Sequence, residues 1–271
     1  MDGSAAYIAL DYWDLSLGSL LVLANAGLSL ALQLGLHKRL LVSSVRMVVQ
    51  LFLMGLVLTV IFTRLSPYLT SLAALIMVAF AGREVAARQE RRLAGLWSYG
   101  LGTASMMLAA VLVTVLALTT ALKPDPWYDP RYALPLLGMI LGNTMTGVSL
   151  GMNSLTTGLH QRRAAVEARL MLGDDRRAAF GPVVRQALRH ALMPIINVMS
   201  ATGVVSIPGM MTGQILGGVP PTEAVKYQIM ILFLIAGDVG LGALAAVFGG
   251  VQRLSDPRHR LRLDRLRTPK G

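Results

Sequence analysis

Apolar segments long enough to cross a membrane alternate with short polar segments along almost the whole chain. A helix needs about 20 apolar residues to cross the hydrocarbon core of a bilayer. The pattern therefore predicts an all-α polytopic membrane protein that forms a single transmembrane domain over residues 1–271. Seven transmembrane helices are expected, at about 15–36, 47–62, 68–82, 97–122, 132–152, 194–216 and 225–251.

The longest polar interruption, residues 158–192, separates the fifth and sixth predicted spans. Its apolar residues recur at helical spacing, which predicts two amphipathic helices and places Leu172 on the apolar face of the first. Gly173 is expected to separate them, because glycine adopts the left-handed conformation that ends many helices. Asp174 or Asp175 then caps the second helix. A basic helix–break–helix between two spans is typical of a cytoplasmic loop that contacts a partner.

The distribution of positive charge predicts the orientation of the spans. Of the 25 Lys and Arg residues, 21 lie in alternate loops that include 158–192 and the C-terminal tail, 252–271. The other four are Arg64, Lys123, Arg131 and Lys226. Because cytoplasmic loops carry the excess of Lys and Arg, the N-terminus is expected outside, and the C-terminus and residues 158–192 inside.

This topology accounts for the net charge of +11 without any binding to nucleic acid. The mean hydropathy of +0.59 also fits a membrane protein. Two interpretations remain for the basic tail. It is either a solvated end, which is favoured, or a segment that binds anionic lipid head groups.

Several kinds of chemistry are absent from the sequence. The chain has no Cys, so it contains neither a disulfide nor a thiolate metal site. None of its lysines stands in a phosphate-binding P-loop motif, and its four histidines are scattered without metal-ligand spacing. The chain is therefore not expected to be an enzyme or to bind a cofactor itself.

Polar and methionine residues within the spans indicate a candidate substrate path. Pro208 removes a backbone hydrogen bond within the sixth predicted span, and freed carbonyl groups must find a neighbour, water or a ligand. Transporters place substrates at such broken helices, although a simple proline kink is the alternative. Thioether sulfur is a soft metal ligand, but methionine more often fills gaps between helices. The candidate path and gate residues are Asn143, Met145, Met152, Asn153, Pro208, Gly209, Met210, Met211 and Gln214.

Glycines recur at a spacing of four residues within two of the predicted spans. Glycines four residues apart let membrane helices approach closely, either at a moving or dimeric interface or in ordinary intramolecular packing, which is favoured. They are Gly138 and Gly142, Gly147 and Gly151, and Gly209, Gly213 and Gly217.

Asp238 is an acid within the last predicted span. Such acids are functional candidates, unless Gly237 and Gly240 let this one face water.

Three motifs carry a resemblance to a known family. Residues 167–173, EARLMLG, resemble the EAA-x3-G signature of ABC-transporter permeases, with Arg169 in place of the third alanine and the downstream Leu-Pro displaced to Met193-Pro194. Residues 138–155, GMILGNTMTGVSLGMNSL, and 206–230, SIPGMMTGQILGGVPPTEAVKYQIM, are similar to the FetB-type iron-export permeases, which are related to plant aluminium-sensitivity permeases.

The resemblance implies a function and partners. It implies a multi-pass permease subunit in the bacterial plasma (inner) membrane that exports iron or another metal. Two permeases would work with two cytoplasmic FetA-type ATPase subunits, which bind the ATP and Mg²⁺. The metal-contacting residues are not indicated. The implied ATPase-coupling residues are Arg163, Glu167, Ala168, Arg169, Gly173 and Asp174.

The resemblance also suggests a mechanism. Closure of the ATPase dimer would push residues 158–192 and move the fifth and sixth spans, while Pro208 and Gly209 gate the path. The alternatives are an ABC permease for a non-metal cargo, a secondary transporter driven by an ion gradient, and a membrane anchor that recruits a cytoplasmic protein. The scarcity of charges within the spans argues against the secondary transporter.

Overall fold

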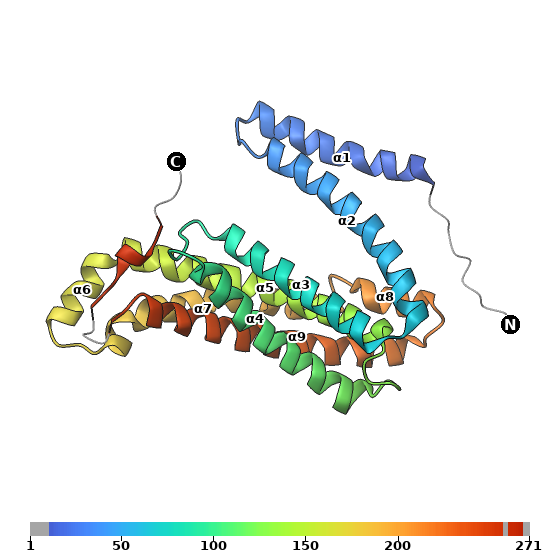
Figure 1. The fold of residues 1–271 in the computed structure, drawn as a ribbon. Coiled ribbons are helices and arrows are strands. Elements are labelled where there is room, and N and C mark those ends of the chain that lie inside the picture. Colours follow the sequence, from blue (N-terminus) through green and yellow to red (C-terminus); the bar gives the residue numbers. More distant parts are fainter. Residues whose placement is uncertain (1–10, 257–259, 268–271) are drawn as a thin grey trace. The chain divides into compact units, whose positions relative to one another are not determined.

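The computed structural model describes residues 11–256 and 260–267, and these form helices joined by turns and loops (Figure 1). Residues 257–259 and 268–271 of the predicted tail lie outside the described residues. The chain divides into two compact units, Met1–Leu65 and Ser66–Gly271.

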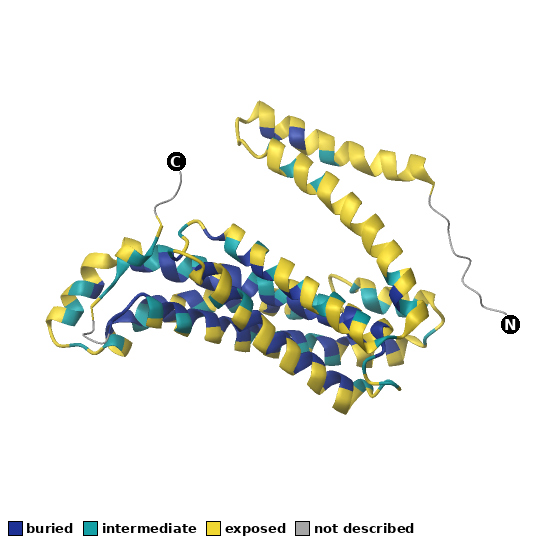
Figure 2. Cartoon of the chain, viewed as in Figure 1, coloured by how far each residue is buried: buried dark blue, intermediate teal, exposed yellow. Residues whose placement is uncertain are grey.

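The first unit is a helical hairpin of α1 (Tyr12–Ala31) and α2 (His37–Arg64). Asp11 starts α1 with a capping box, in which its side chain and that of Asp14 satisfy backbone N–H groups that have no partner within the helix. Most side chains of both helices are exposed, although the segments are apolar (Figure 2). Such a surface suits contact with lipid chains rather than with water.

The second unit is a helix bundle around α5 (Pro130–Gln161), which packs against α3, α4, α7 and α9. The helices before α5 are α3 (Pro67–Arg88) and α4 (Trp97–Leu116), which continues as the π-helix η1 (Ala117–Leu122). Those after it are α6 (Arg163–Met171), α7 (Arg176–Ala201), α8 (Gly209–Leu216), α9 (Pro221–Arg253) and the short 3₁₀ helix η2 (Leu263–Arg265).

Small residues bring the central helices together. A Cβ atom on Gly147 would lie 2.7 Å from Val239 Cγ1 and 3.1 Å from the carbonyl oxygen of Ala191, so α5 contacts α9 and α7 directly. A Cβ atom on Gly151 would also lie 3.2 Å from the Cβ of Ala191. Intramolecular packing is therefore confirmed for this glycine pair. By contrast, Cβ atoms on Gly209 and Gly213 would meet nothing within 4 Å.

The predicted sixth span is not a continuous helix. Six described helices are long and apolar enough to cross a membrane, and neither α7 nor α8 is one of them. The backbone leaves the helical conformation after Ala201 and resumes it only at Gly209. Within the break Gly203 has a φ of +91° and donates its N–H to the carbonyl of Ser206 over 2.9 Å. The broken-helix interpretation is thus confirmed, and the simple proline kink is wrong.

One end of the second unit gathers the segments predicted to be cytoplasmic. The backbone of residues 92–94 pairs with that of residues 265–267, through Ala94 N–H to Arg265 O at 2.7 Å and Arg267 N–H to Arg92 O at 2.8 Å. Figure 1 shows the C-terminal segment beside α6. The interpretation of the tail as a solvated end is therefore wrong for 260–267, where Leu261, Leu263 and Leu266 pack against the core.

Candidate functional site: the coupling corner and a polar groove

The predicted coupling residues lie together on α6 and on the turn that joins it to α7. Gly173, at a φ of +96°, donates its N–H to the carbonyl of Leu170, and Asp174 donates to that of Arg169. These two bonds form a Schellman motif, which satisfies carbonyl groups at the end of α6. Asp175 begins α7 by accepting a hydrogen bond from the N–H of Ala178 over 2.7 Å. We call this turn, residues 171–175, the coupling corner.

Two apolar side chains are exposed at the coupling corner. Met171 is 82% exposed and Leu172 is 86% exposed. Leu172 was expected on the apolar face of this helix, but α6 ends just before it and buries Val166 instead. Contiguous exposed apolar surfaces mark sites of interaction, so this pair makes the corner a candidate contact site. Helical spacing predicted an apolar face, but it did not predict that Met171 and Leu172 are exposed where the helix ends.

Charged residues around the corner are partly paired with each other. Arg163 Nε lies 2.9 Å from Glu167 Oε1, one helical turn away, and Arg169 Nε lies 2.6 Å from Asp174 Oδ2. These pairs are exposed enough to contribute little to stability. The second pair does link α6 to the corner directly. Ala168, also predicted to take part in coupling, is exposed on α6.

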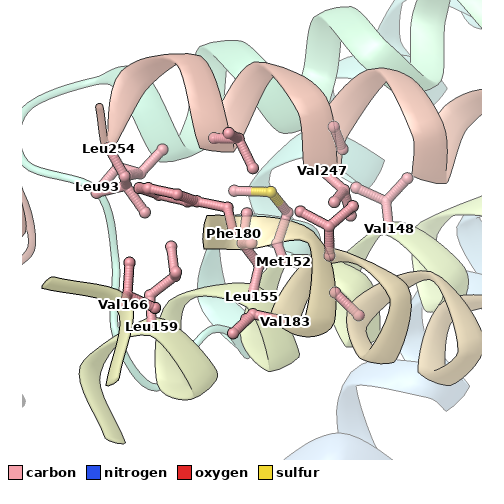
Figure 3. Packing of buried hydrophobic residues seen from close by; sticks show 14 of the residues in the cluster. Leu93, Val148, Met152, Leu155, Leu159, Val166, Phe180, Val183, Val247 and Leu254 are labelled. Carbon is pink, nitrogen blue, oxygen red and sulfur yellow. The ribbon is translucent and has the colours of Figure 1, made fainter. Parts of the chain in front are cut away.

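The corner continues into the core of the second unit. Phe180, Val183 and Ala187 of α7 are almost completely buried, and Val166 of α6 joins the same cluster (Figure 3). Met152 and Leu155 of α5 are fully buried beside them. A displacement of α6 therefore acts on side chains that interdigitate with α5, because close-packed interiors transmit strain.

A polar groove of about 490 Å³ lies between the second half of α5 and residues 186–197 of α7. Its polar lining includes Asn153, Ser154 and Thr157 from α5, with His190 and Asn197 from α7. His190 Nδ1 and Ser154 Oγ are 2.9 Å apart and share a hydrogen bond. Except for Asn153, sequence reasoning missed these residues, although each set recurs at helical spacing and so shares one face.

The groove is suited to a polar or weakly coordinated cargo. It contains one imidazole, the guanidinium of Arg162, amide and hydroxyl groups and the thioether of Met193, but no carboxylate. Over the described residues, no group of three or more His, Asp or Glu side chains is placed to hold a metal ion. A metal that passes here would therefore make weak, exchangeable contacts rather than occupy a permanent site.

The predicted path residues on α5 fall into different environments. Asn143 donates its side-chain amide to the carbonyl of Met139 within its own helix, over 2.8 Å. Asn153 lines the groove, and its Oδ1 accepts the backbone N–H of Glu90 over 3.1 Å. Met145 is partly buried against the core. Met152 is fully buried, so it lines no open surface and acts as a core filler.

The predicted gate residues form a separate group at the start of α8. Pro208 is the residue before α8, with φ −62° and ψ 142°, and Gly209 is its first residue. Met210 and Met211 are partly exposed. Gln214 Oε1 is buried without a hydrogen-bond partner among the described residues. None of these residues lines the groove between α5 and α7, so the structure does not unite the predicted path and gate.

Asp238 is completely buried in α9, which excludes the interpretation that it faces water. The hydroxyl of Thr144 on α5 donates a hydrogen bond to its Oδ2. Its Oδ1 has no hydrogen-bond partner among the described residues. Asp238 therefore links α5 to α9 inside the bundle.

Comparisons with known proteins agree with this description. Residues 12–255 match the model of an uncharacterised protein family, UPF0014. The chain is 36% identical to a UPF0014 membrane protein of Synechocystis sp., over 85% of this chain and 88% of that protein. It is 30% identical to the "Probable iron export permease protein FetB" of Escherichia coli, over 94% of this chain and 96% of that protein. It is also 32% identical to "Protein ALUMINUM SENSITIVE 3" of Arabidopsis thaliana, over 84% and 81%. No solved structure matches the chain.

Proposed function

The chain belongs to the UPF0014 family of membrane proteins, and we propose that it is the permease subunit of an ABC transporter that exports iron or another metal. In this proposal ATP and Mg²⁺ bind to a separate FetA-type ATPase, since the sequence contains no P-loop. Two permeases pair with two ATPases. The similarity to a relative named a probable iron export permease supports the choice of cargo.

The observation that carries this proposal is the exposed pair Met171 and Leu172 at the coupling corner. Apolar side chains of this size gain free energy when a partner covers them, at about 25 cal/mol per Å² of apolar area. The Schellman motif holds their backbone, so little conformational freedom is lost on docking. A groove on the ATPase is the proposed receptor for this pair.

In the proposed transport step, motion passes from the ATPase to α5 through side chains that pack against each other. Closure of the ATPase dimer displaces α6, and the displacement reaches α5 through Val166 and the buried face of α7. Since Gly147 and Gly151 place α5 directly against α7 and α9, a shift of one helix changes the position of the others. Opening at the break after Ala201 then changes access to the path at the opposite end.

Polar side chains on α5 and α7 provide the wall of the proposed path. Asn143, Thr146 and Asn153 are only partly buried on α5, and Asn197 and Ser200 are exposed on α7. Polar groups on membrane helices usually face a water-filled cavity or another protein surface. A second permease copy facing this wall would enclose the path, which supports the proposed homodimer.

The test is recovery of the ATPase with the tagged permease solubilised from its own membranes. Deleting residues 160–190 would remove Phe180, Val183 and Ala187 from the core, so substitutions on the surface are used instead. The double variant Met171→Asp, Leu172→Asp leaves the core intact. We expect mass spectrometry to identify a P-loop ATPase with the wild type and to show about a tenfold loss with the variant, as expected for about 1.4 kcal/mol of lost binding.

The matched control is Leu216→Asp, which changes an exposed leucine at the opposite end of the second unit. This variant is expected to retain the ATPase. If no ATPase accompanies the wild type, and the purified chain alone carries flux in liposomes, the chain is a secondary transporter instead.

The broken helix provides a separate prediction. Pro208→Ala is expected to change substrate-stimulated ATPase activity by about two- to fivefold, because relaxing a proline-fixed backbone alters conformational free energies by roughly 0.4–1 kcal/mol. The activity is measured in proteoliposomes that contain permease and ATPase. If substrate stimulates the ATPase activity of the variant as it does that of the wild type, Pro208 has no role in gating.

A further inference from the structure

The C-terminal tail and α6 enclose a second hollow, of about 490 Å³, at the cytoplasmic end of the second unit. We call it the tail groove and define it by its charged and polar lining. That lining consists of Arg91, His160, Arg163, Glu167, Asp264 and Arg267. It is distinct from the polar groove between α5 and α7, and it includes two residues that were predicted to take part in coupling, Arg163 and Glu167.

The tail groove is held in shape from several sides. Residues 265–267 pair through the backbone with residues 92–94, at 2.7 and 2.8 Å. Leu261 and Leu266 pack against the core cluster that contains Val166 of α6. The guanidinium of Arg265 donates to the carbonyl of Arg253 over 2.7 Å, and Arg253 lies 4.5 Å from the ring centre of Trp97. The tail is therefore a fixed wall rather than a loose end.

The lining carries an excess of positive charge. Glu167 is paired with Arg163 at 2.9 Å, and Asp264 is paired with Arg262 at 2.8 Å. The hydrogen bond from Arg262 lowers the pKa of the Asp264 carboxyl to about 2, so this group is ionised at physiological pH and its charge stays balanced. Arg91 and Arg267 have no acidic partner among the described residues.

Helical geometry connects the tail groove with the coupling corner. Arg163, Glu167 and Met171 stand four residues apart along α6, so they follow one another along one side of the helix. The first two line the tail groove, and the third is exposed at the corner. A partner that covers Met171 therefore reaches Arg91 and Arg267 by extending along the same side of α6.

We propose that the tail groove is a second docking point for the ATPase and receives acidic side chains of that subunit, with Arg91 and Arg267 as the recognising groups. This inference rests on the proposed function. The guanidinium groups of Arg91 and Arg267 are complementary to carboxylate groups of a partner. The tail groove also adjoins the exposed pair Met171 and Leu172. In this proposal the surface that contacts the ATPase is formed by three segments: α6, the loop between α3 and α4, and the C-terminal tail.

The test is the double variant Arg91→Glu, Arg267→Glu, examined by quantitative recovery of the ATPase with the tagged full-length permease. Reversal of two interface charges places like charges together, so we expect recovery to fall at least about tenfold. Loss of attraction at a charged interface also predicts that wild-type recovery decreases as salt rises, whereas the residual recovery of the variant changes less.

The control variant is Arg83→Glu, Arg88→Glu, which makes the same change in net charge at two exposed arginines of α3 outside the groove. It is expected to recover the ATPase as the wild type does. An equal loss in both variants would show a general effect of charge and overturn the proposal. Size-exclusion profiles establish that all variants are folded.

The other outcomes distinguish failure of the second docking point from failure of the proposed function. Undiminished ATPase recovery with Arg91→Glu, Arg267→Glu overturns the second docking point alone. If that variant instead loses only bound phosphatidylglycerol, measured by native mass spectrometry, the groove recognises anionic lipid. Absence of the ATPase from the wild type overturns this inference together with the proposed function.

Discussion

Replacement of Gly147 by leucine is expected to destabilise the second unit strongly. The new Cβ would lie 2.7 Å from Val239 Cγ1 and 3.1 Å from the carbonyl oxygen of Ala191. The side chain can shift, but the backbone carbonyl cannot without separating α5 from α7. Overpacking of this kind costs about 1–3 kcal/mol. Because leucine is the better helix former by roughly 1 kcal/mol, a net loss of up to about 2 kcal/mol remains.

The measurement is the temperature at which detergent-solubilised protein loses its monodisperse peak in size-exclusion chromatography. A net loss of about 2 kcal/mol should lower it by roughly 4–8 °C in a chain of this size. The matched control is Gly142→Leu in the same helix, where a Cβ meets nothing within 4 Å. Equal stability of the two variants would contradict the close approach of α5 to its neighbours.

The sequence predicted the features that follow from local chemistry. The predicted spans correspond to helices wherever the apolar segment is uninterrupted. Asp175 was one of two expected caps, and Gly173 has the left-handed backbone expected of it. Each of these depends on a few neighbouring residues, so composition and spacing were sufficient to predict them.

Other features depend on contacts between distant segments and were therefore missed. The charge of the tail indicated an exposed end, but its leucines pack against the core cluster that contains Val166 of α6, and its backbone pairs with the loop after α3. The amphipathic pattern placed Leu172 on the apolar face of the first loop helix, whereas that helix ends before it. His190 looked isolated because its partner, Ser154, lies 36 residues earlier in the chain. Periodicity predicts which residues share a face, but not what covers that face.

Gly173→Arg is expected to abolish most ATPase recovery and transport while the bundle remains folded. Gly173 has a φ of +96°, and a residue with a side chain pays roughly 1–2 kcal/mol to adopt a left-handed conformation. If the corner must keep this conformation to present Leu172 to the ATPase, the cost weakens docking by about 5- to 30-fold. Gly173 itself is exposed, so no core contact is lost.

The control for this prediction is Gly173→Asn, because asparagine adopts the left-handed conformation more readily than other residues with side chains. The asparagine variant should retain much more ATPase recovery than the arginine variant, at equal thermal stability of the two permeases. This order is expected if the backbone conformation of the corner controls docking. Wild-type transport by Gly173→Arg would show that the corner does not transmit the motion of the ATPase. It would also contradict the proposed transmission from α6 through α7 to α5.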